Sequence, residues 1–429
     1  MISLLYDLTL YLSALFLVPY YLVRGVRYGK ARHGIRERLG IFQQDLRPLL
    51  QGRKVIWVHA VSVGETRAAI PLLKGLRRDY PDAVLLLSNV TETGRKIAAT
   101  IPEIDQVIFF PFDLRWIVRR VLNVIRPDLV ILIETEIWPN FVLEAKQRRI
   151  PLVLVNGRIS DRSFPRYRML GRLLEPILAC IADFCMQSEQ DSRRIRYLGA
   201  ASGRVQVTGN LKFDMQPPRI TSDDLQPLCS LYRLPEDGVV WVAGSTHDGE
   251  EALLIDVYQR LLQTFPKLFL ILVPRHPERA RQVFDELSRK QIQGTLRSEI
   301  GRRSEPFSPG EVLVVDTLGE MLKLYAVSDL VFVGGSLVPI GGHNVLEASL
   351  VKKPVIFGPF MHNFKEIARL IKAAHGGLQV KDADDLHRQM TLLLDNPTEA
   401  RRIGDNGHYL LEENQGATAK TLKVIARHL

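Results

Sequence analysis

Short aliphatic runs alternate with amphipathic stretches through the first half of the chain. The runs include KVIWVHA (54–60) and AVLLLSNV (83–90), and TRAAIPLLKGLRRDY (66–80) between them carries apolar residues at helical spacing. A short apolar run bounded by turn residues predicts a strand, and apolar residues three and four apart predict a helix. DLVILIETEIW (128–138) and PLVLVNGR (151–158) are typical of strands buried on both faces of a parallel sheet. The first half therefore predicts a doubly wound α/β domain.

The same alternation returns after a stretch that contains prolines. Residues 210–238 carry four prolines and lose the aliphatic runs, which favours a linker with some helix. Strand-like runs then resume with VVWVAGST, LFLILVP, VLVVD, LVFVGG and PVIFGP, and the last residues have helical spacing. The pattern predicts five segments: an N-terminal segment at 1–24, a Rossmann-like domain at 25–210, a linker at 211–235, a second Rossmann-like domain at 236–400 and a helical tail at 401–429.

The chain begins with a nearly continuous apolar segment, residues 2–23, which has spanning length and one acidic residue, Asp7. No basic segment precedes it and no small-residue cleavage site follows it, so an anchor helix is favoured over a cleaved signal peptide. Basic residues follow directly, and the positive-inside rule then places the rest of the chain in the cytoplasm. A helix that packs on its own domain or lies in the membrane plane is the alternative.

Composition and charge narrow the picture further. The 429 residues, 46% hydrophobic and 24% charged, suit two globular domains with an additional segment. The three cysteines form no CxxC pair, which argues against a disulfide framework and a structural zinc site. A net charge of +10 points to an anionic partner. Because the basic residues are spread out and no platform of aromatic and basic residues accompanies them, we expect no nucleic-acid binding.

Charged residues occupy several loops that follow predicted strands of the first domain, where ligands bind in doubly wound sheets. VSVGETR places Glu65 at the start of a helix, IETEIWPN places Glu134 and Glu136 after a strand, and GNLKFD contributes Lys212. Glu65 is a candidate catalytic carboxylate, although an acidic residue at a helix N-terminus also stabilises the helix by about 0.3–1 kcal/mol. Lys212 is equally consistent with a solvated linker charge.

A glycine-rich loop, GGSLVPIGGHN (334–344), follows a predicted strand of the second domain and precedes a helix. Accessible backbone amides at a helix N-terminus predict a phosphate site. Asn344 is suited to cap the helix, Glu347 one turn later can reach a ribose, and Arg275 in LVPRHPER supplies a cation. Neither a GxGxxG fingerprint nor a GxxxxGK[ST] loop is present. A glycine-rich turn without a ligand is the alternative.

The motifs HAVSVGE, ETEIWPN, GNLKFD, VPRHPER and GGHNVLEA, in this order, make the chain resemble the 3-deoxy-D-manno-octulosonic acid (Kdo) transferases of lipopolysaccharide assembly. The resemblance covers nearly the whole chain. It implies the GT-B fold, in which two Rossmann-like domains face each other across a cleft, here preceded by a membrane-anchor helix. It also implies transfer of Kdo from CMP-Kdo to the lipid A precursor, on the cytoplasmic side of the inner membrane, without a metal ion or other cofactor.

The resemblance also assigns roles to individual residues. It implies that Glu65 is the general base and that Glu134 and Lys212 support the transition state. Contacts with CMP are implied for Pro274, Arg275, Leu318, Gly319, Glu320, Asn344, Val345, Leu346 and Glu347. Leu318 stands where methionine is usual and Val345 where proline is common, and both changes are minor.

The chemistry is consistent with these roles. An acceptor hydroxyl becomes an effective nucleophile when a carboxylate takes its proton, and the charge on a leaving phosphate requires prearranged donors. Asp382 and Asp384 form the only DxD, at a helix start where Asp382 is suited to be an N-cap, and no two histidines have ligand spacing. We therefore expect no metal site. A sugar-nucleotide epimerase of the same architecture and a non-catalytic membrane scaffold are the alternatives.

Overall fold

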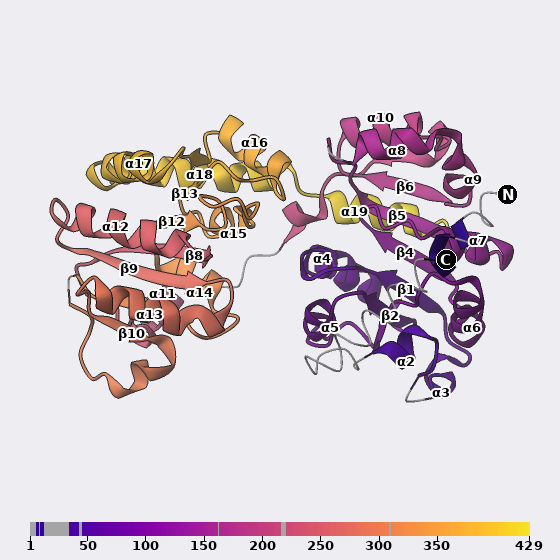
Figure 1. Ribbon diagram of the computed structural model, residues 1–429, viewed down its shortest axis with the longest axis horizontal. Coiled ribbons are helices and arrows are strands. Elements are labelled where there is room, and N and C mark those ends of the chain that lie inside the picture. The colour runs from indigo at the N-terminus through magenta and orange to yellow at the C-terminus, as the bar shows by residue number, and fades with distance from the viewer. Residues whose placement is uncertain are drawn as a thin grey trace. The chain divides into compact units, whose positions relative to one another are not determined.

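The computed structural model describes residues 6–7, 9–12, 34–42, 45–161, 163–215, 220–308 and 310–429. The chain divides into two compact units; in Figure 1 the first runs from indigo to magenta and also includes the yellow helix α19, and the second runs from salmon to yellow. The first unit contains Met1–Met215 and Asn414–Leu429, and the second contains Gln216–Glu413. Each unit holds a seven-stranded sheet. The prediction of two α/β domains is therefore confirmed.

All paired strands of the first sheet are parallel, and their order is β3-β2-β1-β4-β5-β6-β7. The strands are β1 (Val55–His59), β2 (Val84–Asn89), β3 (Gln106–Phe109), β4 (Leu129–Ile133), β5 (Leu152–Gly157), β6 (Asp183–Met186) and β7 (Val205–Val207). The direction in which successive strands are added reverses between β1 and β4. In open α/β sheets, ligands bind beyond the carboxyl ends of the strands at such a reversal point.

Helices cover both faces of the first sheet, as Figure 1 shows for α4 and α5 on one side and α6 on the other. Because alternate side chains of a strand point to opposite faces, β1 directs Trp57 into one hydrophobic core and Ile56 and Val58 into the other. The helices are α2 (Ile35–Arg38), α3 (Arg47–Leu50), α4 (Val63–Asp79), α5 (Glu92–Ala98), α6 (Arg115–Ile125), α7 (Pro139–Gln147), α8 (Phe164–Leu170), α9 (Glu175–Leu178), α10 (Glu189–Tyr197) and α19 (Ala417–Ile425).

The last helix, α19, belongs to the first unit although it follows the whole of the second. Asp214 accepts the N–H of Gly416 at 2.7 Å just before this helix begins. Gly75 of α4 allows close packing, because a Cβ there would lie 2.5 Å from Leu422 Cδ1. The predicted tail at 401–429 is thus divided: α18 (Pro397–Glu413) lies in the second unit and α19 in the first.

The second sheet is also parallel throughout, with the order β10-β11-β9-β8-β12-β13-β14. Its strands are β8 (Val239–Thr246), β9 (Leu268–Pro274), β10 (Gly294–Leu296), β11 (Val312–Val314), β12 (Leu330–Val333), β13 (Val355–Phe357) and β14 (Gly377–Gln379). Its other helices are α11 (Ser222–Leu231), α12 (Glu250–Leu262), α13 (Ala280–Arg289), α14 (Met321–Val327), α15 (Leu346–Leu350), α16 (Lys365–Ala373) and α17 (Ala383–Asp395). This sheet has its reversal point between β8 and β12.

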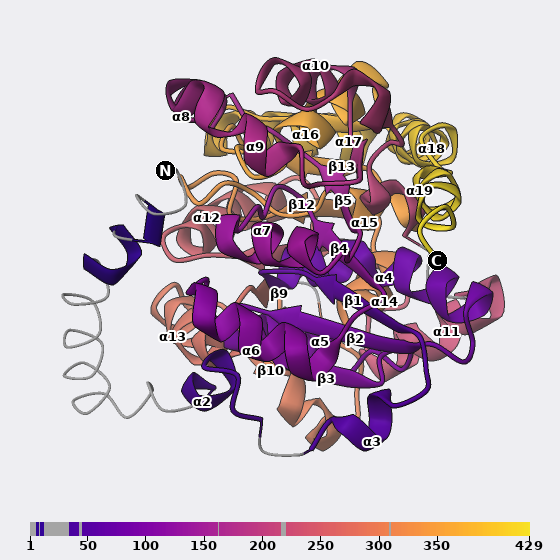
Figure 2. The ribbon, with the colours of Figure 1, turned by 90° about the vertical axis from the view of Figure 1, so that its right-hand side faces the viewer.

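The predicted membrane helix at 2–23 falls mostly on residues outside the described ranges. Residues 6–7 and 9–12 are helical, and Figure 2 shows these dark-blue turns near the N label. A search of the described residues finds no helix with the length and apolar character needed to cross a membrane. The membrane anchor therefore stays a prediction.

Candidate active site

Glu65 lies in the first turn of α4, directly after β1, at the reversal point of the first sheet. Its Oε2 accepts the N–H of Val61 at 2.7 Å, and its Oε1 accepts the hydroxyl of Ser62 at 3.0 Å. Ser62, the N-cap, in turn accepts the N–H of Glu65 at 3.5 Å. This arrangement is similar to a capping box, in which two side chains satisfy the first turn of a helix. Glu65 therefore has the helix-stabilising role that the sequence left open.

The acidity of Glu65 indicates more than a capping role. Burial raises the pKa of Glu65 to about 7, the charges of Glu134 and Glu136 raise it as well, and the hydrogen bonds from Val61 and Ser62 oppose the shift. Capping alone would favour the ionised form and lower the pKa. A carboxyl group that titrates near neutral pH is suited to take a proton during the reaction.

Glu134 follows β4, on the other side of the same reversal point. It has a left-handed backbone conformation, with φ of 61°, and its N–H donates to Val155 O at 2.8 Å. Its Oε1 lies 3.6 Å from Lys212 Nζ, and the Lys212 side chain is only 14% exposed. Lys212 is therefore an ion-paired side chain of the first unit, and the alternative of a solvated linker charge is wrong.

Lys212 is held in place by the turn that carries it. Asn210 Oδ1 accepts the N–H of Lys212 at 3.0 Å, and Asn156 Oδ1 accepts the N–H of Leu211 at 3.0 Å. Asn156 belongs to β5, beside β4. The loops after β1, β4 and β7 thus bring Glu65, Glu134 and Lys212 to one edge of the sheet, as the sequence predicted.

In the second unit, the glycine loop is organised by a buried carboxylate. Glu250, at the start of α12, is 0% exposed. Its Oε2 accepts the N–H of Gly335 at 2.7 Å, and its Oε1 accepts those of Ser336 and Leu337 at 3.0 and 2.9 Å. A glycine fits at position 334, because a Cβ there would lie 2.7 Å from Glu250 Oε2. These amides bind Glu250 and do not face a ligand.

The later glycines of the loop also use their amides internally. The N–H groups of Gly341 and Gly342 both donate to Gly335 O, at 3.1 and 2.8 Å. Both residues have positive φ, 115° and 73°, a backbone conformation that glycine adopts without strain. The expectation of accessible amides at 341 and 342 is therefore wrong, because the loop folds back on itself.

The residues after the glycines begin α15, which has five residues. Asn344 Oδ1 accepts the N–H of Leu346 at 3.3 Å, but the N-cap residue of this helix is Val345, one position later than predicted. Val345 and Leu346 are 0% exposed. These values include the backbone, so neither residue is accessible to a nucleotide in this structure, whereas Asn344 and Glu347 are partly exposed.

A pair of histidines, which the sequence analysis missed, lies at the reversal point of the second sheet. His247 follows β8, His343 belongs to the glycine loop after β12, and their Nε2 atoms are 2.8 Å apart. His276, after β9, has its ring centroid 6.0 Å from that of His247. Burial lowers the pKa of His247, and His276, Arg275 and Arg279 lower it further. The available signal was that each histidine follows a predicted strand, although the sequence does not show that these two strands are neighbours.

The remaining predicted donor contacts lie on the same edge. Pro274 ends β9, and the N–H of Arg275 donates to Thr246 O at 2.9 Å. After β11, the side chain of Leu318 is 79% exposed and Gly319 has φ of 84°. The structure thus places these residues beyond the carboxyl ends of β9 and β11.

Glu320, in the same loop as Leu318, is already engaged by protein groups. It accepts the hydroxyl of Tyr232 at 2.9 Å and Arg297 Nε at 3.1 Å, and it also accepts the hydroxyl of Thr317. Burial opposes ionisation of Glu320, but these hydrogen bonds and the Arg297 charge outweigh it and lower the pKa. A nucleotide contact by Glu320 would compete with these partners.

Solved structures of known proteins share the fold of this chain. A glycosyltransferase from Rickettsia africae covers 88% of this chain and 99% of its own, with a TM-score of 0.59 and 14% identity. A UDP-GlcNAc 2-epimerase from Neisseria meningitidis covers 87% of this chain and 100% of its own, also with a TM-score of 0.59 and 14% identity. At such identities the likeness concerns the fold alone. It defines the two-domain α/β class to which GT-B enzymes belong.

Sequence comparison identifies the family within this class. The family model described as 3-deoxy-D-manno-octulosonic-acid transferase (kdotransferase) matches residues 33–215. The 3-deoxy-D-manno-octulosonic acid transferase of Haemophilus influenzae is 36% identical over 95% of this chain and 93% of its own length. The chain therefore belongs to the 3-deoxy-D-manno-octulosonic acid transferase family and is a glycosyltransferase, which confirms the predicted family.

Proposed function

We propose that the enzyme transfers Kdo from CMP-Kdo to the lipid A precursor by a single displacement, with Glu65 as the general base. The position of Glu65 carries this proposal: the carboxyl group is buried at a reversal point and has a pKa of about 7. The names of the relatives support Kdo as the sugar transferred. CMP as the activating group and lipid A as the acceptor rest on the motif resemblance.

In this scheme, an acceptor hydroxyl oxygen forms a bond to the anomeric carbon of Kdo. The bond from that carbon to the phosphate oxygen of CMP breaks, and its electron pair leaves with CMP. Glu65 takes the hydroxyl proton as the new bond forms. The hydrogen bonds from Val61 and Ser62 hold the carboxylate in place. No covalent sugar–enzyme intermediate is needed, so the configuration at the anomeric carbon inverts.

Lys212 and Glu134 support the charge that develops during transfer. The ammonium group of Lys212 is oriented by its ion pair with Glu134, at 3.6 Å. The hydrogen bond from the backbone N–H of Lys212 to Asn210 Oδ1 fixes the turn that carries it. A cation fixed before the reaction stabilises a transition state better than one that must reorganise. In this proposal, Lys212 interacts with an anionic group of the donor, either the Kdo carboxylate or the phosphate.

The second unit binds CMP in this proposal. Arg275, together with the His247–His343 pair, provides cationic and N–H groups for the phosphate. The exposed side chain of Leu318 provides an apolar surface for the base, and Glu347 interacts with the ribose. We propose that no metal ion and no other cofactor takes part.

Because the proposed acceptor is a lipid, the proposed reaction takes place at a membrane. We propose that the apolar residues 2–23 attach the protein to the inner membrane, with both units on the cytoplasmic side. Basic residues after this segment, such as Arg36, support this, because each juxtamembrane Lys or Arg contributes about 1 kcal/mol near an anionic surface.

The test is mass spectrometry of a phosphorylated lipid A precursor after incubation with the detergent-solubilised protein, Kdo and a CMP-Kdo regenerating system. We expect the acceptor mass to rise by one or more Kdo units, which also counts the additions. An unchanged acceptor, with protein that still binds CMP, would contradict the proposed acceptor. Sugar-nucleotide epimerisation, the alternative that the shared fold leaves, would then be assayed with UDP-GlcNAc and related donors.

A further inference from the structure

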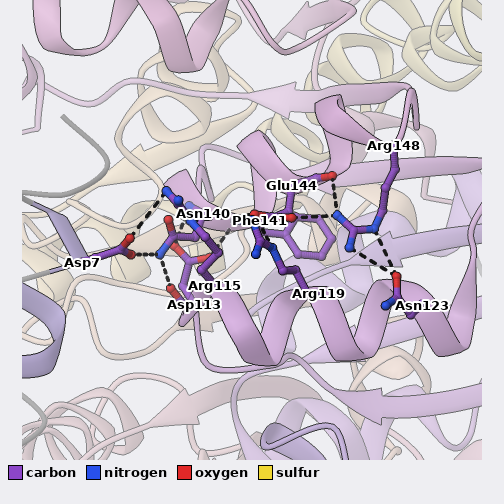
Figure 3. Close-up of polar contacts among 9 residues, drawn as sticks. All are labelled: Asp7, Asp113, Arg115, Arg119, Asn123, Asn140, Phe141, Glu144 and Arg148. Carbon is purple, nitrogen blue, oxygen red and sulfur yellow. Dashed lines mark hydrogen bonds and ion pairs between the residues drawn. The ribbon is translucent and has the colours of Figure 1, made fainter. Parts of the chain in front are cut away.

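The start of the chain is bound to the first unit through polar side chains. Asn140 Nδ2 donates to Asp7 Oδ1 at 2.6 Å, and the hydroxyl of Tyr6 donates to Asp113 Oδ2 at 2.9 Å. The guanidinium of Arg115 lies 3.5 Å from Asp7 Oδ2. Figure 3 shows Asp7 pointing toward Asn140 and Arg115. These contacts join residues near the N-terminus to the start of α6 and α7.

The partners of Tyr6 and Asp7 are buried and fixed by other contacts. Asn140 is 0% exposed and Asp113 is 6% exposed. Asn140 also donates its amide to Asp113 O at 2.7 Å, and the carboxylate of Asp113 accepts the N–H groups of Asn140 and Phe141 at 3.0 and 2.7 Å. Undocking the N-terminus would therefore remove hydrogen-bond partners from groups that are already desolvated, which is unfavourable.

Arg115 extends this network along α6 and α7. Its Nε lies 3.7 Å from Glu144, whose side chain is 1% exposed. Glu144 also pairs with Arg119 at 3.0 Å and with Arg148 at 2.7 Å, and Figure 3 shows the row of contacts that results. Asp7 thus adds to an ordered set of charges on the first unit.

Residues 34–42 also contact the first unit. A Cβ at Gly34 would lie 2.3 Å from Cε2 of Phe109, so this glycine packs directly against the Phe109 ring. The guanidinium of Arg38 lies 4.4 Å from the centre of the same ring, and Arg38 O accepts the N–H of Phe112 at 3.1 Å. Residues 6–12 and 34–42 are therefore both held by the first unit.

We propose that Tyr6, Asp7 and residues 9–12 stay docked on the first unit at the membrane, so that these residues lie on the same side of the bilayer as that unit. A single crossing between Leu12 and Gly34 would put these two docked ends on opposite sides. Leaving and returning would need two crossings of about 20 residues each, and only the 21 residues 13–33 lie between them. This inference rests on the membrane association in the proposed function.

Chemical cross-linking in membranes tests the docking. Asp7 and Asn140 are each replaced by cysteine in a chain whose native Cys180, Cys185 and Cys229 are alanine. We expect a short bis-methanethiosulfonate to link the two positions, as identified by mass spectrometry of the peptides. The matched control pairs Asp7→Cys with Tyr197→Cys, because Tyr197 on α10 is 67% exposed and its ring contacts Phe164, whereas Asp7 contacts Asn140 and Arg115. Equal linking of the two pairs, or no link to position 140, would overturn the proposal.

Labelling from each side of the membrane tests the topology without altering the docking contacts. Tyr11 is 49% exposed, and in the same cysteine-free chain Tyr11→Cys provides one reactive thiol. We expect a membrane-impermeant maleimide to label it in inverted vesicles and not in intact spheroplasts. Labelling in intact spheroplasts would overturn the docking while membrane association stands. Protein found only in the soluble fraction would instead overturn the membrane association itself.

Discussion

The two sheets reverse their strand order in the same way, but the groups at the two reversal points have opposite electrical character. At the first, Glu134 lies close enough to raise the pKa of Glu65, and Lys212 is the cation. At the second, His247 is surrounded by His276, Arg275 and Arg279, and Glu250 is occupied by backbone N–H groups. In the proposed function, the same topology thus provides a proton-accepting edge in one unit and an anion-binding edge in the other.

Three helix starts show what separates a structural carboxylate from a candidate base. Glu65, Asp191 and Glu250 all lie in the first turn of a helix and accept a backbone N–H from a loop. Glu250 accepts four such groups. Asp191 has Arg158 and Arg194 nearby, whereas Glu65 has two carboxylates nearby. Burial raises the pKa of all three carboxyl groups; the two carboxylates near Glu65 raise its pKa further, whereas the two arginines near Asp191 oppose the rise there.

The largest expected effect is that of Glu65→Gln on turnover. An amide keeps an acceptor for Val61 but cannot take the proton of the acceptor hydroxyl. Since general base catalysis contributes about 10²–10⁴-fold, we expect kcat to fall by that factor while CMP affinity, measured by calorimetry, stays unchanged.

Asp191→Asn is the matched control, because Asp191 has the same bonds to an N-cap serine and a loop amide. It should lower kcat less than twofold. Comparable losses of kcat in the two variants would mean that Glu65 acts only as a capping residue.

Glu250→Ala should cause the next largest effect, on the second unit. It leaves the N–H groups of Gly335, Ser336 and Leu337 buried without an acceptor, each at about 1–3 kcal/mol. We expect the free energy of unfolding to fall by about 3 kcal/mol or more. We also expect CMP affinity to fall at least tenfold. Thermal denaturation and calorimetry measure the two quantities. Unchanged CMP affinity in folded protein would mean that the glycine loop does not form the donor site.

Ionisation of Glu65 should also affect stability. Its pKa of about 7 in the folded protein exceeds the ordinary glutamate value of 4.5, so the folded state binds the proton more tightly than the unfolded state. This contribution is complete below about pH 4.5 and is lost as the pH rises through about 7. At pH 8, Glu65→Gln should therefore be more stable than the parent, by on the order of 3 kcal/mol. Urea unfolding at pH 5 and pH 8 measures this, and a less stable variant at both would show that capping dominates.

The pH dependence of the rate should be smaller but more specific. If Glu65 must be ionised, kcat/KM should fall about tenfold per pH unit below pH 7 and level off above it. A pH-rate profile from pH 5 to 9 measures this limb. A profile that is flat between pH 5.5 and 7 would assign the base to a group with an ordinary carboxyl pKa.

Much of this site could be predicted from the sequence, because its signals are local. The run DLVILI predicts the buried strand β4, and the acidic residues directly after it must then lie at the carboxyl edge of the sheet. The same reasoning places Glu65 after β1. The helix cap at Asp382 is also local, and its side chain accepts the N–H of Asp385 at 2.9 Å.

The parts that could not be predicted depend on pairing between distant segments. Glu250 and the Gly335 amide are 85 residues apart, and His247 and His343 are 96 apart. The sequence spacing of these residues does not indicate that they are in contact. They meet because β8 and β12 are adjacent in the sheet. Likewise, the amphipathic pattern of α19 predicts a helix with one buried face but does not say that this face packs on α4.

Metal removal should have the smallest effect on activity. It tests whether Arg275 and the His247–His343 pair stabilise the leaving phosphate without a metal ion. No group of three or more His, Cys, Asp or Glu side chains in the described ranges is placed to hold a metal ion. Asp384 of the only DxD pairs with Arg260 at 2.6 Å. If the charge of Arg275 and hydrogen bonds from the histidine pair stabilise the leaving phosphate, full activity should persist in excess EDTA, as followed by transfer of Kdo to the lipid acceptor. Loss of activity that Mg²⁺ or Mn²⁺ restores would mean that the cationic edge of the second unit needs a metal ion to stabilise the departing CMP.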